Sequence, residues 1–269
     1  MPALTLHLFA LTQGTDPKTF VQKLRQAGIT VVVSSRPRHV VVPTTLDSNP
    51  LVTQRWDLLV LLQTPGGTFS LPNELQQAVR NEYKIVVGIP SKLLGSYPER
   101  DAKLKREASS TPLTGSLENA QGKSSSKNLE VSPDLLAFMD ELTKEHDKPV
   151  TMLNLLQFHH PDGKKNYYQY GQAFIPVAGK RGGSAKLVGN VVKPGTDNAD
   201  SRGRTSRPET NWWNEISIVH YPSIRHFCDM LAGDDYQAIN AKYRLAALRD
   251  TFLLCTTEFD LEENTSAKL

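Results

Sequence analysis

The densest group of chemically capable side chains lies at residues 210–223, Thr-Asn-Trp-Trp-Asn-Glu-Ile-Ser-Ile-Val-His-Tyr-Pro-Ser. This stretch is rich in β-branched and aromatic residues and is stopped by a Tyr-Pro pair, so it predicts a strand that leads into a new element. Alternate residues of a strand point to opposite faces, so Trp213, Glu215 and Tyr221 are expected on one face. His220 is expected on the other face.

Glu215 and His220 are the candidate proton-transfer groups on this strand. A half-buried carboxyl has its pKa raised by desolvation and can act as a general base near neutral pH. A neutral imidazole near a pocket mouth is suited to the same task. The alternatives are that Glu215 pairs with an arginine, such as Arg181 or Arg244, and that His220 faces solvent.

Two tyrosines and a second histidine complete the candidate catalytic set. Tyr170 and Tyr221 could donate hydrogen bonds to a carbonyl or enolate, with Arg181 helping to polarise it. Such tyrosines also occur as core residues whose hydroxyl reaches the surface. His7, in the first predicted strand, matches Asn154 in the second half of the chain. It is either a base in a cavity or a hydrogen-bonded core histidine.

The substrate is expected to contact Arg181, Trp213, Asn154, Phe158 and Arg244. No metal site is predicted, because the adjacent His159 and His160 would point in opposite directions on a strand. No cofactor is expected either. The chain has no haem attachment signature, and its Gly-Gly pairs lack the spacing of dinucleotide or phosphate loops.

The elements that must position these residues follow a β-α-β-β-α-β order in the first half, which is typical of a ferredoxin-like unit. Strands are predicted at 4–11, 29–33, 56–63 and 83–89, and 40–42 can pair with the second of them. Asp16 is the expected N-cap of a first helix that ends at Gly28, and a second helix is predicted at 71–82.

The same order is predicted again after Pro149. Strands are expected at 150–158, 185–192, 210–221 and 251–261, and helices at 167–180 and 223–249. A helix capped by Ser132 precedes them. Residues 5–8 align with 152–155, and 56–60 with 213–217, so we infer a tandem duplication. Two such units in one chain can cover each other's apolar sheet face.

Residues 96–130 have little apolar content and no hydrophobic period, apart from a helical start at 100–108. This composition predicts a flexible linker. The expected division is a divergent ferredoxin-like unit at 1–95, this linker, and a barrel unit with an N-terminal helix at 131–269.

Composition is that of an ordinary soluble globular protein, with 22% charged and 39% hydrophobic residues in 269 and a formal net charge of +3. No nucleic-acid or membrane partner is expected, because the basic residues are scattered and the aromatic strand signature of RNA-binding sheets is absent. We read no signal peptide and no spanning apolar run. Cys228 and Cys255 have no metal spacing, so buried, reduced thiols in a cytoplasmic protein are expected.

A set of short motifs occurs in order between residues 149 and 261. They are Met-Leu-Asn-Leu-Leu-Gln-Phe at 152–158, Tyr-Gln-Tyr-Gly at 168–171, Gly-Gly at 182–183, Trp-Asn-Glu at 213–215, Val-His-Tyr-Pro-Ser at 219–223, Asp-Tyr-Gln at 235–237 and Arg-Leu-Ala-Ala-Leu-Arg-Asp at 244–250. Together they resemble a domain-of-unknown-function branch of the dimeric α+β barrel superfamily. The first half keeps only a Trp before its third strand.

This resemblance implies ferredoxin-like units whose sheets pack into a barrel, with a pocket between sheet and helices. Superfamily members include cofactor-independent monooxygenases, polyketide cyclases, isomerases and haem-binding enzymes, beside proteins with no assigned activity. We therefore expect an α+β protein of two tandem ferredoxin-like units forming an intramolecular barrel pseudo-dimer, present as a monomer or a homodimer.

The functional hypothesis is that the second half binds a small apolar metabolite. As an enzyme, the protein would transfer a proton on a carbonyl compound without a cofactor, as cyclases, isomerases and decarboxylases do, with Glu215 or His220 as the base. The competing hypothesis is a non-catalytic ligand-binding or assembly protein whose pockets are filled by side chains. An open cavity with converging polar groups would favour the enzyme.

Overall fold

The computed structural model describes residues 3–63, 70–120, 122–193, 200–202 and 208–262. Eight antiparallel strands close into a barrel in the order β1-β3-β2-β8-β5-β7-β6-β4. The strands are β1 (Ala3–Leu11), β2 (Thr30–Val42), β3 (Leu58–Gln63), β4 (Val79–Gly88), β5 (Val150–Phe158), β6 (Ser184–Val191), β7 (Glu215–Tyr221) and β8 (Leu248–Glu258).

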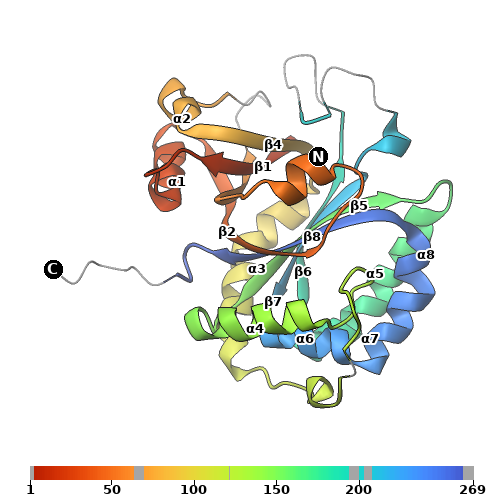
Figure 1. Ribbon diagram of the computed structural model, residues 1–269. Helices are drawn as coiled ribbons and strands as arrows, with labels where there is room; N and C mark the ends of the chain where they lie inside the picture. Colours follow the sequence, from red (N-terminus) through yellow and green to blue (C-terminus); the bar gives the residue numbers. More distant parts are fainter. Residues whose placement is uncertain (1–2, 64–69, 121, 194–199, 203–207, 263–269) are drawn as a thin grey trace.

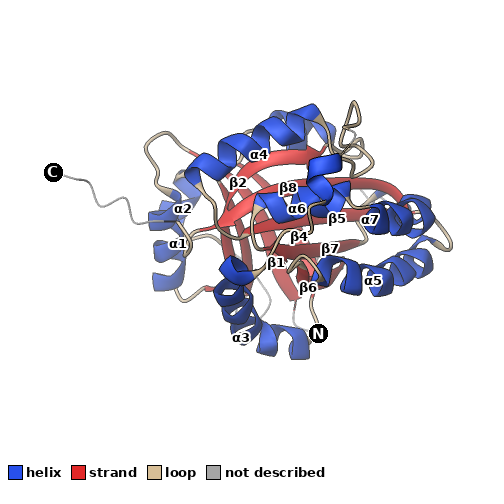
Figure 2. Cartoon of the chain, turned by 90° about the horizontal axis from the view of Figure 1, so that it is seen from below, coloured by secondary structure: helices blue, strands red, loops and turns tan. Residues whose placement is uncertain are grey.

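Helices surround the strands on the outside (Figure 1; Figure 2). They are α1 (Pro17–Gln26), α2 (Asn73–Gln77), α3 (Ser91–Glu107), α4 (Pro133–Glu145), α5 (Gly163–Gly179), α6 (Ile224–Ala232), α7 (Asp234–Ile239) and α8 (Leu245–Ala247). The expected N-caps of α1 and α4 are confirmed, because Asp16 accepts a hydrogen bond from the Thr19 amide and Ser132 one from the Leu135 amide. Within the described ranges, no helix combines the length and the apolar character needed to span a membrane.

The four strands of each half have the same internal order, β4-β1-β3-β2 in the first and β8-β5-β7-β6 in the second. The two sets meet at two junctions. At one, β2 pairs with β8 from Ser35 to Val42. At the other, β4 and β6 share two residue pairs, Val87 with Val191 and Gly88 with Asn190.

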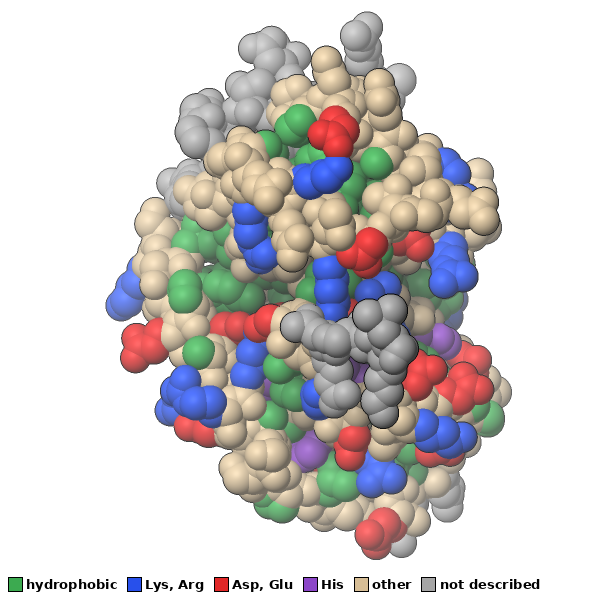
Figure 3. Space-filling view, turned by 90° about the vertical axis from the view of Figure 1, so that its left-hand side faces the viewer, with side chains coloured by type: hydrophobic (Ala, Val, Ile, Leu, Met, Phe, Trp, Pro, Cys, Tyr) green, Lys and Arg blue, Asp and Glu red, His purple; other side chains and the backbone are tan. Residues whose placement is uncertain are grey.

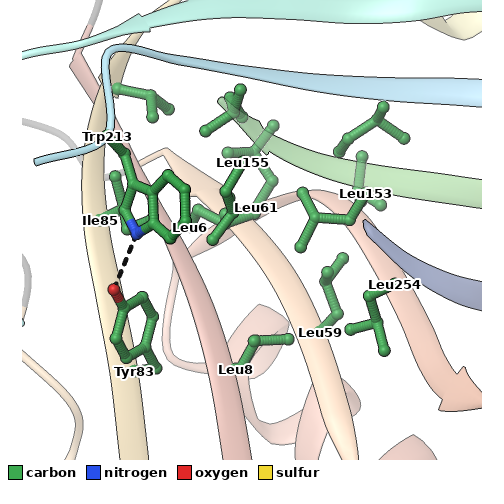
Figure 4. Packing of buried hydrophobic residues seen from close by; sticks show 14 of the residues in the cluster. Leu6, Leu8, Leu59, Leu61, Tyr83, Ile85, Leu153, Leu155, Trp213 and Leu254 are labelled. Carbon is green, nitrogen blue, oxygen red and sulfur yellow. Dashed lines mark hydrogen bonds between the residues drawn. The ribbon is translucent and has the colours of Figure 1, made fainter. Parts of the chain in front are cut away.

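The barrel interior is a packed apolar core to which all eight strands contribute. Leu6 and Leu8 of β1 meet Leu153 and Leu155 of β5 across the barrel (Figure 4). The indole N–H of Trp213 donates a 2.9 Å hydrogen bond to the Tyr83 hydroxyl on β4. Each fully buried leucine contributes about 1.5–3 kcal/mol relative to an exposed one. The interior therefore holds the two halves together and is not a ligand channel.

Two outer apolar layers lie between the barrel and its helices. In the first half, Leu58, Val60 and Leu62 of β3 pack in one cluster with Phe20 and Leu24 of α1. In the second half, a layer between β5, β7, β8 and helices α4–α7 contains the two cysteines. Both Cys228 and Cys255 are buried free thiols, as expected. On the surface, acidic and basic side chains are interspersed over the face shown in Figure 3.

Two element predictions in the first half are wrong. β2 is one continuous strand through Pro37, with register shifts after that residue in its pairing with β8. Such an irregularity accommodates the missing amide donor of a proline. The helix predicted at 71–82 ends at Gln77, and β4 begins at Val79. Pairing of this segment with β1, in which Glu82 lies opposite Phe9, overrides its helical pattern.

The segment 96–130, expected to be a flexible linker, is packed on the fold over its described residues. It begins inside α3, where Lys105 pairs with Glu258 at 2.5 Å and with Asp260 at 2.7 Å. Further on, the Thr114 amide donates to the Asp229 carboxylate at 2.9 Å. Tyr97 and Leu129 of the segment also pack in the apolar clusters, but apolar residues this far apart in a polar stretch form no hydrophobic period that the sequence could reveal.

Candidate functional site

A cavity of about 650 Å³ lies between the outer face of the second-half strands and helices α5 and α7. The strand wall carries every second residue of β5 and β7, as alternation requires. Its members are Met152, Asn154, Glu215, Ser217, Val219 and Tyr221. The opposite wall comes from α5, α7 and the turn that follows, and includes Tyr167, Tyr170, Phe174, Tyr236 and Arg244. Most of the lining is apolar, with polar groups at a few points, as is usual in small-molecule sites.

Glu215, the first residue of β7, is the acidic group of the cavity wall. Burial raises the pKa of this carboxyl to about 7, and the charge of Lys164 opposes that rise only in part. Glu215 makes no ion pair with the described residues, so the alternative in which an arginine neutralises it is not found. At neutral pH the carboxyl is therefore divided between its acid and base forms.

The tyrosines of the cavity wall are neutral hydrogen-bond donors. Burial raises the pKa of Tyr167, Tyr170, Tyr221 and Tyr236 above the usual value, so all four keep their hydroxyl protons. The Tyr170 and Tyr236 hydroxyl oxygens are 3.4 Å apart, which is a long contact. The Tyr221 hydroxyl has a weak acceptor, the Met230 sulfur at 3.7 Å.

Arg244 brings a buried cation to the cavity wall. It ends the π-helical turn Asn240–Arg244 and is 2% exposed. Its Nη2 atom has no hydrogen-bond partner among the described residues. It lines the same cavity as Tyr167 and Tyr170, and its charge opposes the rise in pKa of both phenols. Asn154, opposite on β5, donates to the Met152 carbonyl at 3.2 Å and also lines the cavity.

His220 does not reach this cavity. Its side chain points from β7 into the barrel interior, whereas that of Glu215 points from the other face of the strand, and His220 is 1% exposed. Burial lowers the pKa of His220 to about 3, with a smaller effect of the nearby Lys186 ammonium in the same direction. It is therefore an uncharged interior residue. The sequence predicted that His220 lies either near the pocket mouth or facing solvent, and both predictions are wrong.

Trp213 and Phe158 also lie off the cavity wall. Trp213 precedes the first residue of β7, so the strand alternation that grouped it with Glu215 does not extend to it. Its ring enters the barrel core (Figure 4). Phe158 ends β5 and packs on the Tyr167 ring with centroids 5.3 Å apart.

Arg181 is bound by carboxylates outside the cavity. Its guanidinium lies 3.3 Å from Asp229 and 3.1 Å from Asp235, and both the arginine and Asp229 are buried. In the first half, His7 faces the α1 side of the sheet, with its Nδ1 atom 2.6 Å from a Glu82 oxygen. Burial lowers the pKa of this imidazole. The structure thus separates both residues from Glu215, Tyr170, Tyr221, Asn154 and Arg244, which it brings together.

A cluster of carboxylates that could hold a cation lies at the end of α3. Oxygen atoms of Asp101, Glu258 and Asp260 lie within 4.8 Å of one another. Lys105 contacts all three, and the fully buried Lys186 pairs with Asp101 and Glu258. Two ammonium groups already occupy the space between these oxygens. The cluster is therefore an ion-pair network that anchors α3 to β6 and β8.

Comparison with known proteins gives no family model and no curated protein that matches the chain. Among solved structures, the chain is similar to a protein of unknown function from Rhodopseudomonas palustris, with 25% identity over 47% of this chain and 93% of that one, and a TM-score of 0.34. It is also similar to a Lactobacillus acidophilus protein described as a "putative monooxygenase", with 7% identity over 96% of this chain and 93% of that one, and a TM-score of 0.46.

Proposed function

We propose that the protein is a cofactor-independent enzyme that transfers a proton on a carbonyl-containing, largely apolar metabolite bound in the second-half cavity. The observation that carries this proposal is Glu215, a carboxyl on the cavity wall with no ion-pair partner among the described residues and a pKa raised to about 7. A general base works best when its pKa lies near the operating pH.

We also propose that the barrel is an intramolecular pseudo-dimer of two tandem ferredoxin-like units. The shared strand order of the two halves supports this proposal. The two units differ in what covers the outer face of the matching strand. The outer face of β3 carries Leu58, Val60 and Leu62 packed against α1, whereas the matching face of β7 carries Glu215 and Ser217 beside the cavity.

The proposed step is removal of a proton from the carbon next to the substrate carbonyl. The Glu215 carboxylate takes this proton, and the electron pair of the C–H bond moves to the carbonyl oxygen to give an enolate. Hydroxyls of Tyr170 and Tyr236 would donate to that oxygen in the proposed step, which is supported by their raised pKa values and their long mutual contact of 3.4 Å. Return of the proton from Glu215 to a different atom completes an isomerisation. In a cyclisation, the enolate carbon instead forms a bond to a second carbonyl carbon of the same molecule, the π electron pair of that carbonyl moves to its oxygen, and this oxygen takes the proton from Glu215.

The test is deuterium exchange next to the carbonyl of a panel of aryl ketones and keto acids in D₂O, followed by proton NMR. We expect exchange with the wild-type protein, with a rate that rises as pH passes through about 7, where the Glu215 carboxyl ionises. Glu215→Gln should abolish this exchange.

The matched control is Glu141→Gln, which changes an exposed glutamate on α4. Equal exchange by wild type and Glu215→Gln would refute the assignment. Binding without exchange would favour a non-catalytic ligand-binding protein.

A further inference from the structure

We infer that the ligand of the second-half cavity is an anion, with an apolar body and a carboxylate or similar planar oxyanion that Arg244 binds. This inference rests on the proposed use of the cavity as a small-molecule site and names the chemical class of its occupant. It does not depend on whether Glu215 transfers a proton.

The first argument is the charge balance around Arg244. A guanidinium stays charged at every accessible pH. Arg244 is 2% exposed, yet it forms no ion pair with the described residues, and its Nη2 atom has no hydrogen-bond partner there. A buried charge without a counterion is strongly unfavourable. A bound anion would supply the counterion that the described chain does not.

A comparison with Arg181 strengthens this argument. Arg181 is equally buried, and two carboxylates, Asp229 and Asp235, contact its guanidinium. The fold therefore provides acidic partners where an arginine has a structural role. Arg244 lies on a cavity wall and has none among the described residues.

The acidic residue of the cavity does not fill that role. Glu215 forms no ion pair with Arg244, and burial raises the pKa of its carboxyl to about 7, the opposite of what a paired arginine would do. Tyr167 lines the same cavity, and the charge of Arg244 lowers its pKa while that of Glu215 raises it. Because Glu215 and Arg244 form no ion pair with each other, both remain available to a molecule bound in the cavity.

The shape and lining of the cavity define the rest of the ligand. Its volume of about 650 Å³ and its wall of Met152, Phe174, Val219 and Leu253 suit an apolar body such as an aryl or alkyl group. The tyrosine hydroxyls near Arg244 are donors, which favours an acceptor-only head group. A carboxylate matches the planar fork of an arginine in two parallel hydrogen bonds.

The test is isothermal titration calorimetry with cinnamate and with its neutral, equally shaped amide, cinnamamide. We expect wild type to bind cinnamate about tenfold to a hundredfold more tightly, as a charge-assisted contact implies. Arg244→Met, which keeps the length of the side chain, should remove this preference. Arg244→Lys, which keeps the charge without the fork, should retain part of it. Glu141→Gln, which changes the exposed glutamate on α4, should keep the preference.

Urea unfolding of the ligand-free proteins gives the second measurement. If Arg244 serves a ligand, Arg244→Met should unfold at the same or a higher urea concentration than wild type, because a buried unpaired charge is removed. A clearly lower midpoint would show a structural role and overturn the inference. The inference would also be overturned if wild type bound cinnamate no more tightly than cinnamamide, or if it bound neither compound. If the preference depends on Arg244 but Glu215→Gln still catalyses exchange, the proton-transfer proposal fails and this inference stands.

Discussion

Replacement of Glu215 by glutamine should change how the stability of the protein depends on pH. Burial raises the pKa of this carboxyl from 4.5 to about 7, so the folded state holds a proton that the unfolded state releases at lower pH. The folded state therefore loses stability as pH rises from about 4.5 to about 7, and the loss is complete above that range. Glutamine resembles the protonated carboxyl and does not ionise, so the variant should escape this loss.

The size of the effect follows from the two pKa values. The interval between 4.5 and about 7 corresponds to a ceiling of about 3 kcal/mol, at about 1.4 kcal/mol for each pH unit. Partial exposure of the side chain lowers this ceiling. We therefore expect the gain in unfolding free energy of Glu215→Gln over wild type to be about 2 kcal/mol larger at pH 8 than at pH 5.

Urea unfolding at the two pH values, followed by circular dichroism, measures this difference. Groups that titrate equally in both proteins cancel when the variant is compared with wild type at each pH. Glu141→Gln serves as the control, because an exposed carboxyl should show no such gain. A gain of the same size at both pH values, or a smaller one at pH 8, would show that the Glu215 carboxyl is not desolvated and would refute the reasoning.

Four further substitutions, at three positions, test the packing described above, each by urea unfolding. Trp213→Phe should lower the unfolding free energy by about 2 kcal/mol, because it leaves a void and removes the donor to Tyr83; no loss would contradict a bond across the barrel. Lys186→Met should cost about 3 kcal/mol by leaving the Glu258 carboxylate with fewer partners, whereas a neutral result would show that Lys105 is sufficient. Ser132→Ala should cost about 1 kcal/mol through the lost helix cap, and Ser132→Asp should restore most of it.

Local signals predicted the order of elements in the second half, although β7 begins at Glu215 and not at residue 210, and the helix predicted at 223–249 is divided into α6, α7, a π-helical turn and α8 before β8 begins at Leu248. Val150–Phe158 is the strand that its apolar run indicates, and Ser132 and Asp16 begin helices where capping chemistry requires. The first half was harder because long-range pairing decides its elements. β2 continues through Pro37 because it has partners on both sides, and no local pattern contains that information.

In the candidate site too, local patterns were predictable from the sequence, whereas contacts between distant residues were not. Strand alternation correctly groups Glu215 with Tyr221, but it fails for Trp213, which lies before the first strand residue. Sequence could not separate the two arginines, because the acidic partners of Arg181 lie about fifty positions away and become neighbours only in the folded chain. The unpaired state of Arg244 is likewise a property of the tertiary structure.

The two junctions of the barrel differ in the number of residue pairs that close them. The β2–β8 junction is long, with pairs from Ser35 to Val42, whereas β4 and β6 share two residue pairs and one further bond, from the Val192 amide to the Val86 carbonyl at 3.0 Å. Gly189 leaves little room beside that short junction, because a Cβ atom there would lie 2.8 Å from Ile89. The short β4–β6 junction is therefore also closed by side chains that bridge it, such as the hydrogen bond from Trp213 to Tyr83 and the ion pair of Lys186 with Asp101.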